Sequence, residues 1–428
     1  MMQNWKKYSL GELSKSITYG YTESASLKEI GPKFLRITDI QNSFISWDIV
    51  PYCIISDKNL KKYQLEIGDI IIARTGNSTG ANAIIKDEIN AVYASYLIRY
   101  QLNEKIVYPF YVAYCLKSKK WFDFVDAIKG GSAQPGANAQ QFAQFPINLP
   151  PLTEQRAIAS ILSALDDKIE LNLQMNKTLE EMAMALYKHW FVDFGPFKDD
   201  EFVESELGMI PKGWEVKRLG DVSEFSNGFA FKSTDLLKEE QEDCFHVFKM
   251  GHILKGGGLK SDGTKSWIKK DKCIKLDKYV LKIGDILMSM TDMKDNMTIL
   301  GHTALMNENI KFIVNQRVGL IRAKNNIGID YPFIYITTNH KDYIEKLRSQ
   351  ANSGVQVNLS TDAIKNSKIL APFLQLNLEF DAQVKPLFEK INQNSLENQV
   401  LKDKRDTLLP KLISGEIRVK HLEVLQNV

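Results

Sequence analysis

Two glycine-rich loops in the first third of the chain carry side chains suited to reading nucleic-acid bases. They are ARTGNSTG at 73–80 and KGGSAQPGANAQQ at 129–141. The polar residues that they offer are Arg74, Thr75, Asn77, Ser78, Gln134 and Asn138. Arginine bonds twice to guanine, and asparagine or glutamine bonds twice to adenine, in the major groove. The set therefore predicts base contacts, although each residue alone also fits an ordinary solvated loop.

A matching polar loop occurs in the second half of the chain, SGVQVNLS at 353–360, where Gln356 and Asn358 take the same part. Four basic residues near the loops of the two halves are candidates for DNA phosphates. They are Lys33, Arg36, Lys249 and Lys255. The recurrence in both halves supports base recognition more strongly than any single residue does.

The sequence shows no signature of catalysis. It lacks the phosphate-binding G-x-x-x-x-G-K-[ST] motif, H-E-x-x-H and G-x-S-x-G. The Asn-Pro-Pro-aromatic tetrapeptide of amino-methyltransferases is also missing. The four cysteines are far apart and form no CxxC pair, which argues against a zinc site and fits a reducing compartment. We therefore expect a binding protein with no catalytic residues, no metal and no cofactor.

Short apolar segments must position these loops. β-Branched and aromatic runs predict strands at 34–40, 67–73 and 94–100, a helix at 108–118 and an extended segment at 145–151. The opening segment at 5–13 and the segments that follow it recur in the same order at 214–222, 245–253, 283–289, 318–323, 331–336 and 368–373, with offsets that run from 209 to 223. The chain therefore holds two copies of one module.

Each module is followed by a long helix with a heptad pattern. The first runs over 153–190, and its ladder reappears 222 residues later. The predicted seam contains Leu162, Leu165, Ile169, Asn172, Asn176, Leu179, Leu186, Val384, Leu387, Ile391, Asn394, Asn398, Leu401 and Leu408. This gives an α+β fold class with domains at 1–151 and 201–375, a central helix at 152–200 and a C-terminal helix and tail at 376–428.

Asparagines at the centre of both ladders predict how the helices pair. Antiparallel pairing brings Asn172 to Asn398 and Asn176 to Asn394, which fixes register at some expense of stability. Parallel pairing also matches asparagines, and solvated helix residues are a further interpretation. An approximate two-fold relation between the copies favours the antiparallel form. Pro386 predicts a kink or a late start of the second helix, and Pro410 an end or bend near Leu409.

Composition fits a globular protein with polyanion-binding modules. The net charge is +3, with excesses of +4 over 1–150 and +3 over 201–375, and −4 over 151–200. Excesses of this size are common, so they only agree with nucleic-acid binding. The N-terminal residues lack a secretory signal and no apolar run reaches transmembrane length, so we expect a cytoplasmic protein with no membrane partner.

The chain resembles the specificity subunits of type I restriction–modification systems. Five segments carry the resemblance. They are LPPLTEQRAIASILSALDDKIELN (149–172), WFVDFGPF (190–197), ELGMIPKGWEVKRLGDV (206–222), IGDIIIARTGNSTG (67–80) and LLPKLISGEI (408–417). The likeness covers essentially the whole chain.

The resemblance implies two target-recognition domains that each read half of a bipartite site in double-stranded DNA. It implies that the helices act as a spacer and dock two methyltransferase subunits, with restriction subunits as a further partner. An off-seam apolar set on the first helix is a candidate docking face, namely Ile161, Leu171, Met175, Met182 and Tyr187. A DNA-modifying enzyme of unfamiliar type and a coiled-coil scaffold without a DNA role are the alternatives.

Overall fold

The computed structural model describes residues 5–40, 44–129, 136–260, 263–293, 297–307, 311–325, 327–352, 354 and 356–419. Its contacts divide the chain into two compact units. Unit 1 comprises Met1–Glu170 with Val400–Val428, and unit 2 comprises Leu171–Gln399. Each unit therefore combines one module with part of both long helices, and each is described by itself.

Unit 1 contains eight strands and four short helices among its described residues. The strands are β1 (Lys6–Ser9), β2 (Ser14–Tyr19), β3 (Lys33–Leu35), β4 (Ile70–Ala73), β5 (Asn82–Ile84), β6 (Ala91–Tyr93), β7 (Leu97–Leu102) and β8 (Pro146–Leu149). The helices are α1 (Asp57–Tyr63), α2 (Pro109–Cys115), α3 (Lys119–Ile128) and α4 (Ala139–Ala143). The central sheet has the order β2-β7-β4-β5, with separate pairs β1-β8 and β3-β6.

Unit 2 repeats this plan. Its strands are β9 (Phe202–Ser205), β10 (Gly208–Pro211), β11 (Glu215–Arg218), β12 (Ser223–Asn227), β13 (Cys244–Phe248), β14 (Trp267–Lys269), β15 (Ile286–Ser289), β16 (Thr291–Met293), β17 (Thr303–Leu305), β18 (Phe312–Val314), β19 (Val318–Ala323), β20 (Gln356–Asn358) and β21 (Lys368–Ala371). Its short helices are α6 (Leu219–Val222), α7 (Tyr331–Asn339), α8 (Lys341–Arg348) and α9 (Thr361–Asn366). The sheet β12-β19-β15-β17 and the pair β11-β21 match unit 1 strand for strand, which confirms the duplication.

Both central sheets are covered on two faces, which explains their continuous apolar strands. In β4, Ile70 and Ile72 belong to the core that contains α2, whereas Ile71 packs in a second core with Leu35 and Tyr93. Strand β15 alternates in the same way between two cores. The predicted strands at 34–40 and 245–253 are shorter than expected, because each turns into a 3₁₀ helix, Ile37–Ile40 or Met250–His252.

The Ile-Gly-Asp sequence before each of these strands has a structural role. Gly68 and Gly284 have φ of 90° and 91°, a backbone conformation that favours glycine. The aspartate that follows pairs with an arginine of the neighbouring strand. In unit 2, Arg322 Nε lies 2.7 Å from Asp285 Oδ1. In unit 1, Arg99 Nη1 lies 3.5 Å from Asp69 Oδ2. These buried carboxylates hold the turn closed and are not free for chemistry.

The two long helices are α5 (Leu152–Phe191) and α10 (Leu374–Ser414). The start of α5 is fixed by Gln155, which is fully buried. Its side chain accepts a bond from the backbone N–H of Tyr108 (2.8 Å) and donates to the carbonyl of Pro150 (2.9 Å). Asn377 donates to the carbonyl of Pro372 in the matching place at the start of α10. The prolines before each helix and these amides together set where the helices begin.

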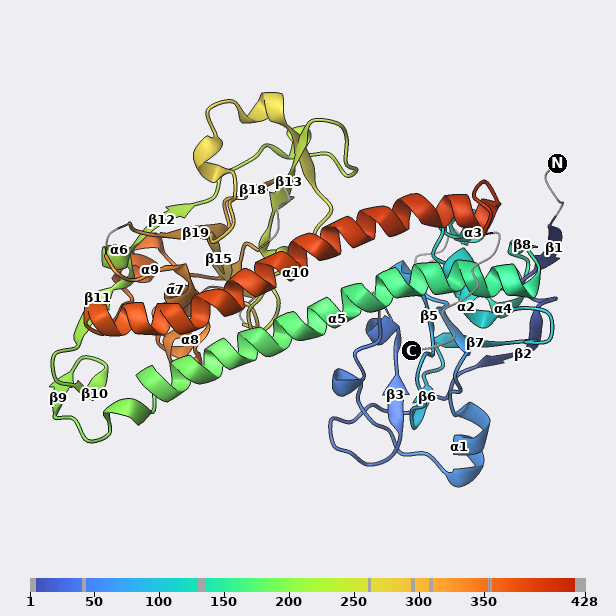
Figure 1. Ribbon diagram of the computed structural model, residues 1–428, viewed down its shortest axis with the longest axis horizontal. Coiled ribbons are helices and arrows are strands. Elements are labelled where there is room, and N and C mark those ends of the chain that lie inside the picture. The colour runs from blue at the N-terminus through green and yellow to red at the C-terminus, as the bar shows by residue number, and fades with distance from the viewer. Residues whose placement is uncertain are drawn as a thin grey trace. The chain divides into compact units, whose positions relative to one another are not determined.

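In unit 2 the helices pack antiparallel through their asparagines (Figure 1). Asn172 Nδ2 donates to Asn398 Oδ1 at 2.9 Å, and Asn394 Nδ2 donates to Asn176 Oδ1 at 2.9 Å. These are the pairs that antiparallel packing predicts. Val384 and Ile391 are buried beside them, with Leu179, Leu186 and Leu387 packed against the same core. Both donating amides find an acceptor across the seam, and Asn172 Oδ1 is the atom of this layer left without a partner among the described residues. The amide pairs favour this register over shifted ones.

In unit 1 the helices also pack antiparallel, around Ile158, Leu162, Leu409 and Leu412. Beside this layer lies an ion-pair cluster. Arg405 Nη1 donates to Asp166 Oδ1 at 2.9 Å, Lys117 Nζ donates to Oδ2 at 3.2 Å, and the Tyr114 hydroxyl donates to Oδ2 at 2.9 Å. Asp166 and Arg405 stand where the repeat has Phe388 and Ala183, which are both buried in the core of unit 2.

The expectations of a late start at Pro386 and of an end near Leu409 are wrong, whereas a kink or bend at these prolines stays a prediction. The helix runs through Pro386 and Pro410 to Ser414. Both prolines are exposed, as are Ala382 and Asp406, whose carbonyls lose their helical partner. Because water can bond these carbonyls, the helix continues at a lower cost than in a buried position. The described residues after Ser414 form a turn and no strand.

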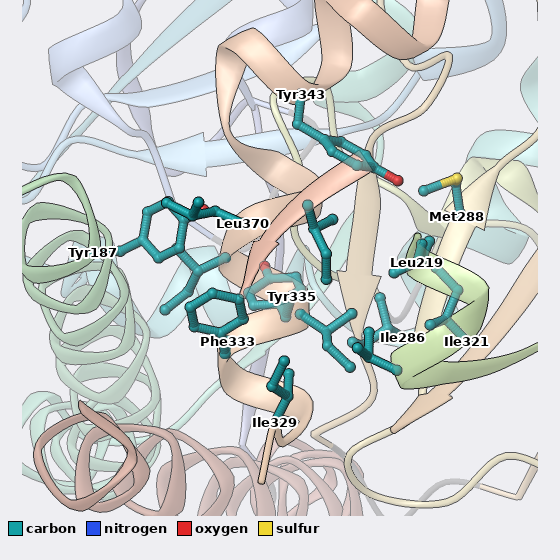
Figure 2. Packing of buried hydrophobic residues seen from close by; sticks show 14 of the residues in the cluster. Tyr187, Leu219, Ile286, Met288, Ile321, Ile329, Phe333, Tyr335, Tyr343 and Leu370 are labelled. Carbon is teal, nitrogen blue, oxygen red and sulfur yellow. The ribbon is translucent and has the colours of Figure 1, made fainter. Parts of the chain in front are cut away.

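One residue of the candidate docking face belongs to the core. Tyr187 of α5 is 5% exposed, and its ring lies 5.6 Å from the ring of Phe333 in α7 (Figure 2). Its hydroxyl accepts a bond from Thr337. Tyr187 is therefore not available for docking, and Ile161 also packs partly against the core of unit 1. Leu171 and Met182 are about half exposed and remain candidates.

Candidate nucleic-acid interface

The structure brings the two polar loops of unit 1 together. Thr75 forms an antiparallel bridge with Gly136, and the N–H of Ala137 donates to the carbonyl of Arg74 at 3.0 Å. These contacts join the loop after β4 to the segment before α4. Gln134 lies outside the described residues. The predicted base-reading residues thus come from two loops that meet at one place on the module.

Arg74 is the member of this set whose side chain lies against an aromatic ring. Its guanidinium carbon lies 5.0 Å from the centre of the Tyr19 ring, and its Nε has no protein partner among the described residues. The Tyr19 hydroxyl is held by the N–H of Ala139. The backbone N–H of Arg74 donates to the carbonyl of Tyr96, whose side chain is 57% exposed. The arginine is therefore stacked on a fixed ring, with its Nε shielded from solvent.

The neighbouring loop residues differ in how far their side chains are already used. Asn77 is exposed, within the 3₁₀ turn Gly76–Ser78. Asn138 is also exposed, but its side chain caps α4 by accepting from the N–H of Gln141 at 2.9 Å. Ser78 and Thr75 are half-buried. Asn77 is therefore the amide whose side chain is free of such a structural role. The Asn138 side chain would have to contact a base while it also caps α4.

Unit 2 builds the same junction with different residues. Strand β16 pairs with β20, and the Thr291–Asn358 pair corresponds to Thr75–Gly136. Gln356 and Asn358 are both exposed, on either side of the buried Val357. Met290 takes the place of Arg74, and its N–H donates to the carbonyl of Arg317. The two modules therefore present one backbone arrangement with different side chains.

Sequence reasoning missed the aromatic and basic residues that border these junctions. Tyr19 and Tyr96 border the junction in unit 1, and the exposed Arg317 stands in unit 2 where Tyr96 stands in unit 1. Tyr96 and Arg317 occupy the turn before β7 or β19, where the repeat aligns SYL with QRV. Comparing the two copies position by position would have pointed to that turn.

Three of the four predicted phosphate contacts are engaged within the protein. Lys33 Nζ donates to the carbonyl of Val50 at 3.0 Å, and Arg36 forms a two-bonded pair with Asp39. Lys249 Nζ donates to the hydroxyl of Ser266 at 2.9 Å. Lys255 is exposed. All four phosphate contacts remain predictions. Lys255 could contact a phosphate without first breaking a hydrogen bond within the protein.

Other kinds of site were sought in the described part of the chain. No group of three or more His, Cys, Asp or Glu side chains there is arranged to hold a metal ion. None of the described helices is long and apolar enough to cross a membrane. Burial raises the pKa of Cys53 and Cys273 to about 11, so these thiols are poor nucleophiles at neutral pH.

Comparison with known proteins identifies the family. The model described as "Type I restriction modification DNA specificity domain" matches twice, at residues 2–181 and 211–401. The MjaIX specificity subunit of Methanocaldococcus jannaschii is 32% identical over 73% of this chain and 70% of that protein. The HindI specificity subunit of Haemophilus influenzae is 26% identical over 97% of this chain and 100% of that protein.

A solved structure agrees with the fold. The crystal structure of the type I restriction–modification S subunit from M. genitalium superposes with a TM-score of 0.53 at 18% identity, covering 96% of both chains. The double family match corresponds to the two modules of the fold, and the polar junction occurs in both. The chain therefore belongs to the family of type I restriction–modification specificity subunits, the non-catalytic subunits that recognise the DNA target sequence.

Proposed function

We propose that the chain reads an interrupted DNA site, with one half-site read by each module. One observation carries this proposal: the junction of two polar loops is built twice on the same topology, once at Thr75–Gly136 and once at Thr291–Asn358. Two copies of this loop junction in a single chain allow two separate contacts with the DNA duplex. A reader with two devices recognises two short sequences separated by a gap.

The two half-sites should differ in sequence. At the first junction the side chains are Arg74, Tyr96 and Asn77, whereas Met290, Arg317 and Met293 stand at the corresponding positions of the second. Arginine favours guanine, and methionine offers only apolar contact. The cation thus follows β4 in the first module, whereas in the second module it lies in the turn before β19. We assign the first half-site to residues 1–151 and the second to 201–375.

The long helices are proposed to hold the methyltransferase subunits that carry out the chemistry. Leu171 and Met182 are 52% and 53% exposed on α5, and they are the two apolar side chains of the candidate docking face that are most open to a partner. The matching residues of α10 are Gln393 and Lys404, which are exposed and polar. Two methyltransferase subunits would therefore meet unlike surfaces. Restriction subunits are a further partner of the assembled complex, and catalysis and its cofactors belong to these partners.

Mapping of methylated adenine in a host that expresses this chain with its own methyltransferase tests the proposal. We expect one new methylated motif, made of two short sequences with a gap of constant length. A continuous motif would contradict the two-reader arrangement. An assembled, folded complex that adds no methylation would favour a scaffold, and methylation by the chain alone would favour an enzyme.

A further inference from the structure

The second module carries a lysine-rich segment that has no counterpart in the first. Between β13 and β15, residues 249–285 contain ten lysines and four aspartates, an excess of six positive charges. The equivalent segment between β3 and β4, residues 36–69, contains four basic and five acidic residues, an excess of one negative charge. The segments are nearly equal in length, so the difference lies in their chemistry.

Most of these lysines are exposed. The eight exposed lysines are Lys255, Lys260, Lys265, Lys269, Lys272, Lys275, Lys278 and Lys282. None of the eight is within ion-pair distance of a carboxylate in the described parts of the chain, whereas Lys270 is paired with Asp243. Unpaired like charges repel one another and do not stabilise the fold. Their accumulation in one segment therefore calls for an anionic partner.

The segment is held by a rigid base. Strand β14 pairs with β13, and the ring of His246 lies between Trp267 at 5.0 Å and Phe312 at 4.7 Å. Cys273 and Ile268 are buried beneath the lysines that flank them. In Figure 1 the segment is the yellow extension beyond β13 and β18. Cations fixed on such a base lose less conformational entropy on binding than cations on a mobile tail.

We propose that this lysine-rich segment binds the phosphate backbone of the DNA at the second half-site, independently of base identity. The inference rests on the proposed function and adds to it an asymmetry: the second module contributes most of the salt-dependent affinity, and the first module depends more on its reading loop. Lysine acts as a compact point charge and suits phosphate, whereas the stacked guanidinium of Arg74 suits base edges.

Two triple variants with equal loss of charge test the asymmetry. In the first, Lys265, Lys269 and Lys272 are replaced by glutamine. In the control, Lys58, Lys61 and Lys62 of α1, which are also exposed and lie in the equivalent segment, are replaced by glutamine. Each is assembled with the methyltransferase, and binding to a duplex carrying the mapped motif, and to a scrambled duplex, is measured by anisotropy from 50 to 300 mM potassium chloride.

The plot of log affinity against log salt concentration has a negative slope. The second-module variant should make this slope less negative by about 2 to 3, because each of the three lost phosphate contacts contributes about 0.9. Affinity should fall alike for both duplexes, so the discrimination between them is retained. The control variant should change the slope by less than about 1. Equal slopes for the two variants would overturn the inference while leaving the proposed function intact.

Failure of the proposed function would look different, because the unmodified complex would then not distinguish the two duplexes at any salt concentration. Acetylation of lysines with and without DNA gives a second measurement on the unmodified complex. Protection of Lys265, Lys269 and Lys272, with little at Lys58, Lys61 and Lys62, is the expected pattern. Equal protection of both sets would contradict the proposed asymmetry even if a variant failed to fold.

Discussion

The Asp166→Ala variant is expected to lower the free energy of unfolding of unit 1 by about 3 kcal/mol. Asp166 binds Arg405, Lys117 and Tyr114, and its side chain is 11% exposed while that of Arg405 is 19% exposed. Its removal leaves two cations side by side and a tyrosine hydroxyl without its acceptor. Breaking a fully buried pair costs about 3–5 kcal/mol, and the residual exposure here points to the lower end.

Thermal unfolding and hydrogen exchange measure this effect. The melting temperature should fall by roughly 6–12 °C, at about 2–4 °C for each kcal/mol in a domain of this size. Faster exchange should appear in α2 and in the N-terminal turns of α5. Asp167→Ala is the matched control. Asp167 follows Asp166 in α5 and pairs with Lys86, but its side chain is 59% exposed. It should change stability by at most about 1 kcal/mol. Equal effects of both variants would contradict the account.

The contribution of Asp166 should also depend on pH. Burial alone would raise the pKa of this carboxyl, but Lys117 and Arg405 outweigh burial and leave its pKa below the ordinary value. A lowered folded pKa means that the stabilisation is complete above the unfolded pKa of about 3.9 and is lost as pH falls through the folded pKa. The stability difference between wild type and Asp166→Ala should therefore be constant near neutral pH and shrink below about pH 4. A difference that persists unchanged at pH 2.5 would argue against the ion pair as its source.

Arg74→Ala is expected to weaken recognition by about 1–3 kcal/mol, or roughly 5- to 150-fold. The reason is its geometry: the guanidinium is stacked over Tyr19, beside the junction of the two polar loops. A two-bonded contact to guanine cannot be replaced by one ammonium group, so Arg74→Lys should not restore binding. Methylation mapping of the variant should show one relaxed position in one half-site.

Lys58→Ala is a suitable control for Arg74→Ala, since it removes one exposed positive charge of the same module. It should leave the preferred bases unchanged. If Arg74→Ala lowers binding to all duplexes equally, Arg74 contacts phosphate rather than a base. If it relaxes both half-sites, the assignment of one module to one half-site is wrong.

The sequence predicted the duplication, the paired helices and their register because these depend on repeated local patterns. The heptad with asparagines at matching positions is visible in the letters alone, and Asn172 and Asn398 meet in the structure. Departures arose where tertiary context decides. Pro386 remains inside α10 because its face of the helix is open to water, and Tyr187 is buried because α7 covers it. Neither fact follows from spacing along the helix.

The candidate site was predictable to a smaller extent. Glycine-rich loops at matching places indicated where the reading junctions lie, and the bridge between Thr75 and Gly136 joins two of them. Which side chains are already engaged was not predictable. Arg36 is held by Asp39 three residues on, Asn138 caps a helix, and Lys33 bonds a carbonyl from a distant loop. Tyr96 could have been noticed by comparing the two copies position by position, whereas the place of Tyr19 beside Arg74 needed the fold.

Exchange of the first module tests the central claim most directly. Residues 1–151 are replaced by the matching segment of a specificity subunit that has a known and different target, and methylated adenine is mapped across the genome. The two-reader account predicts that one half of the motif changes to that of the donor, while the other half and the length of the gap stay the same. A motif in which both halves change, or in which neither does, would contradict it.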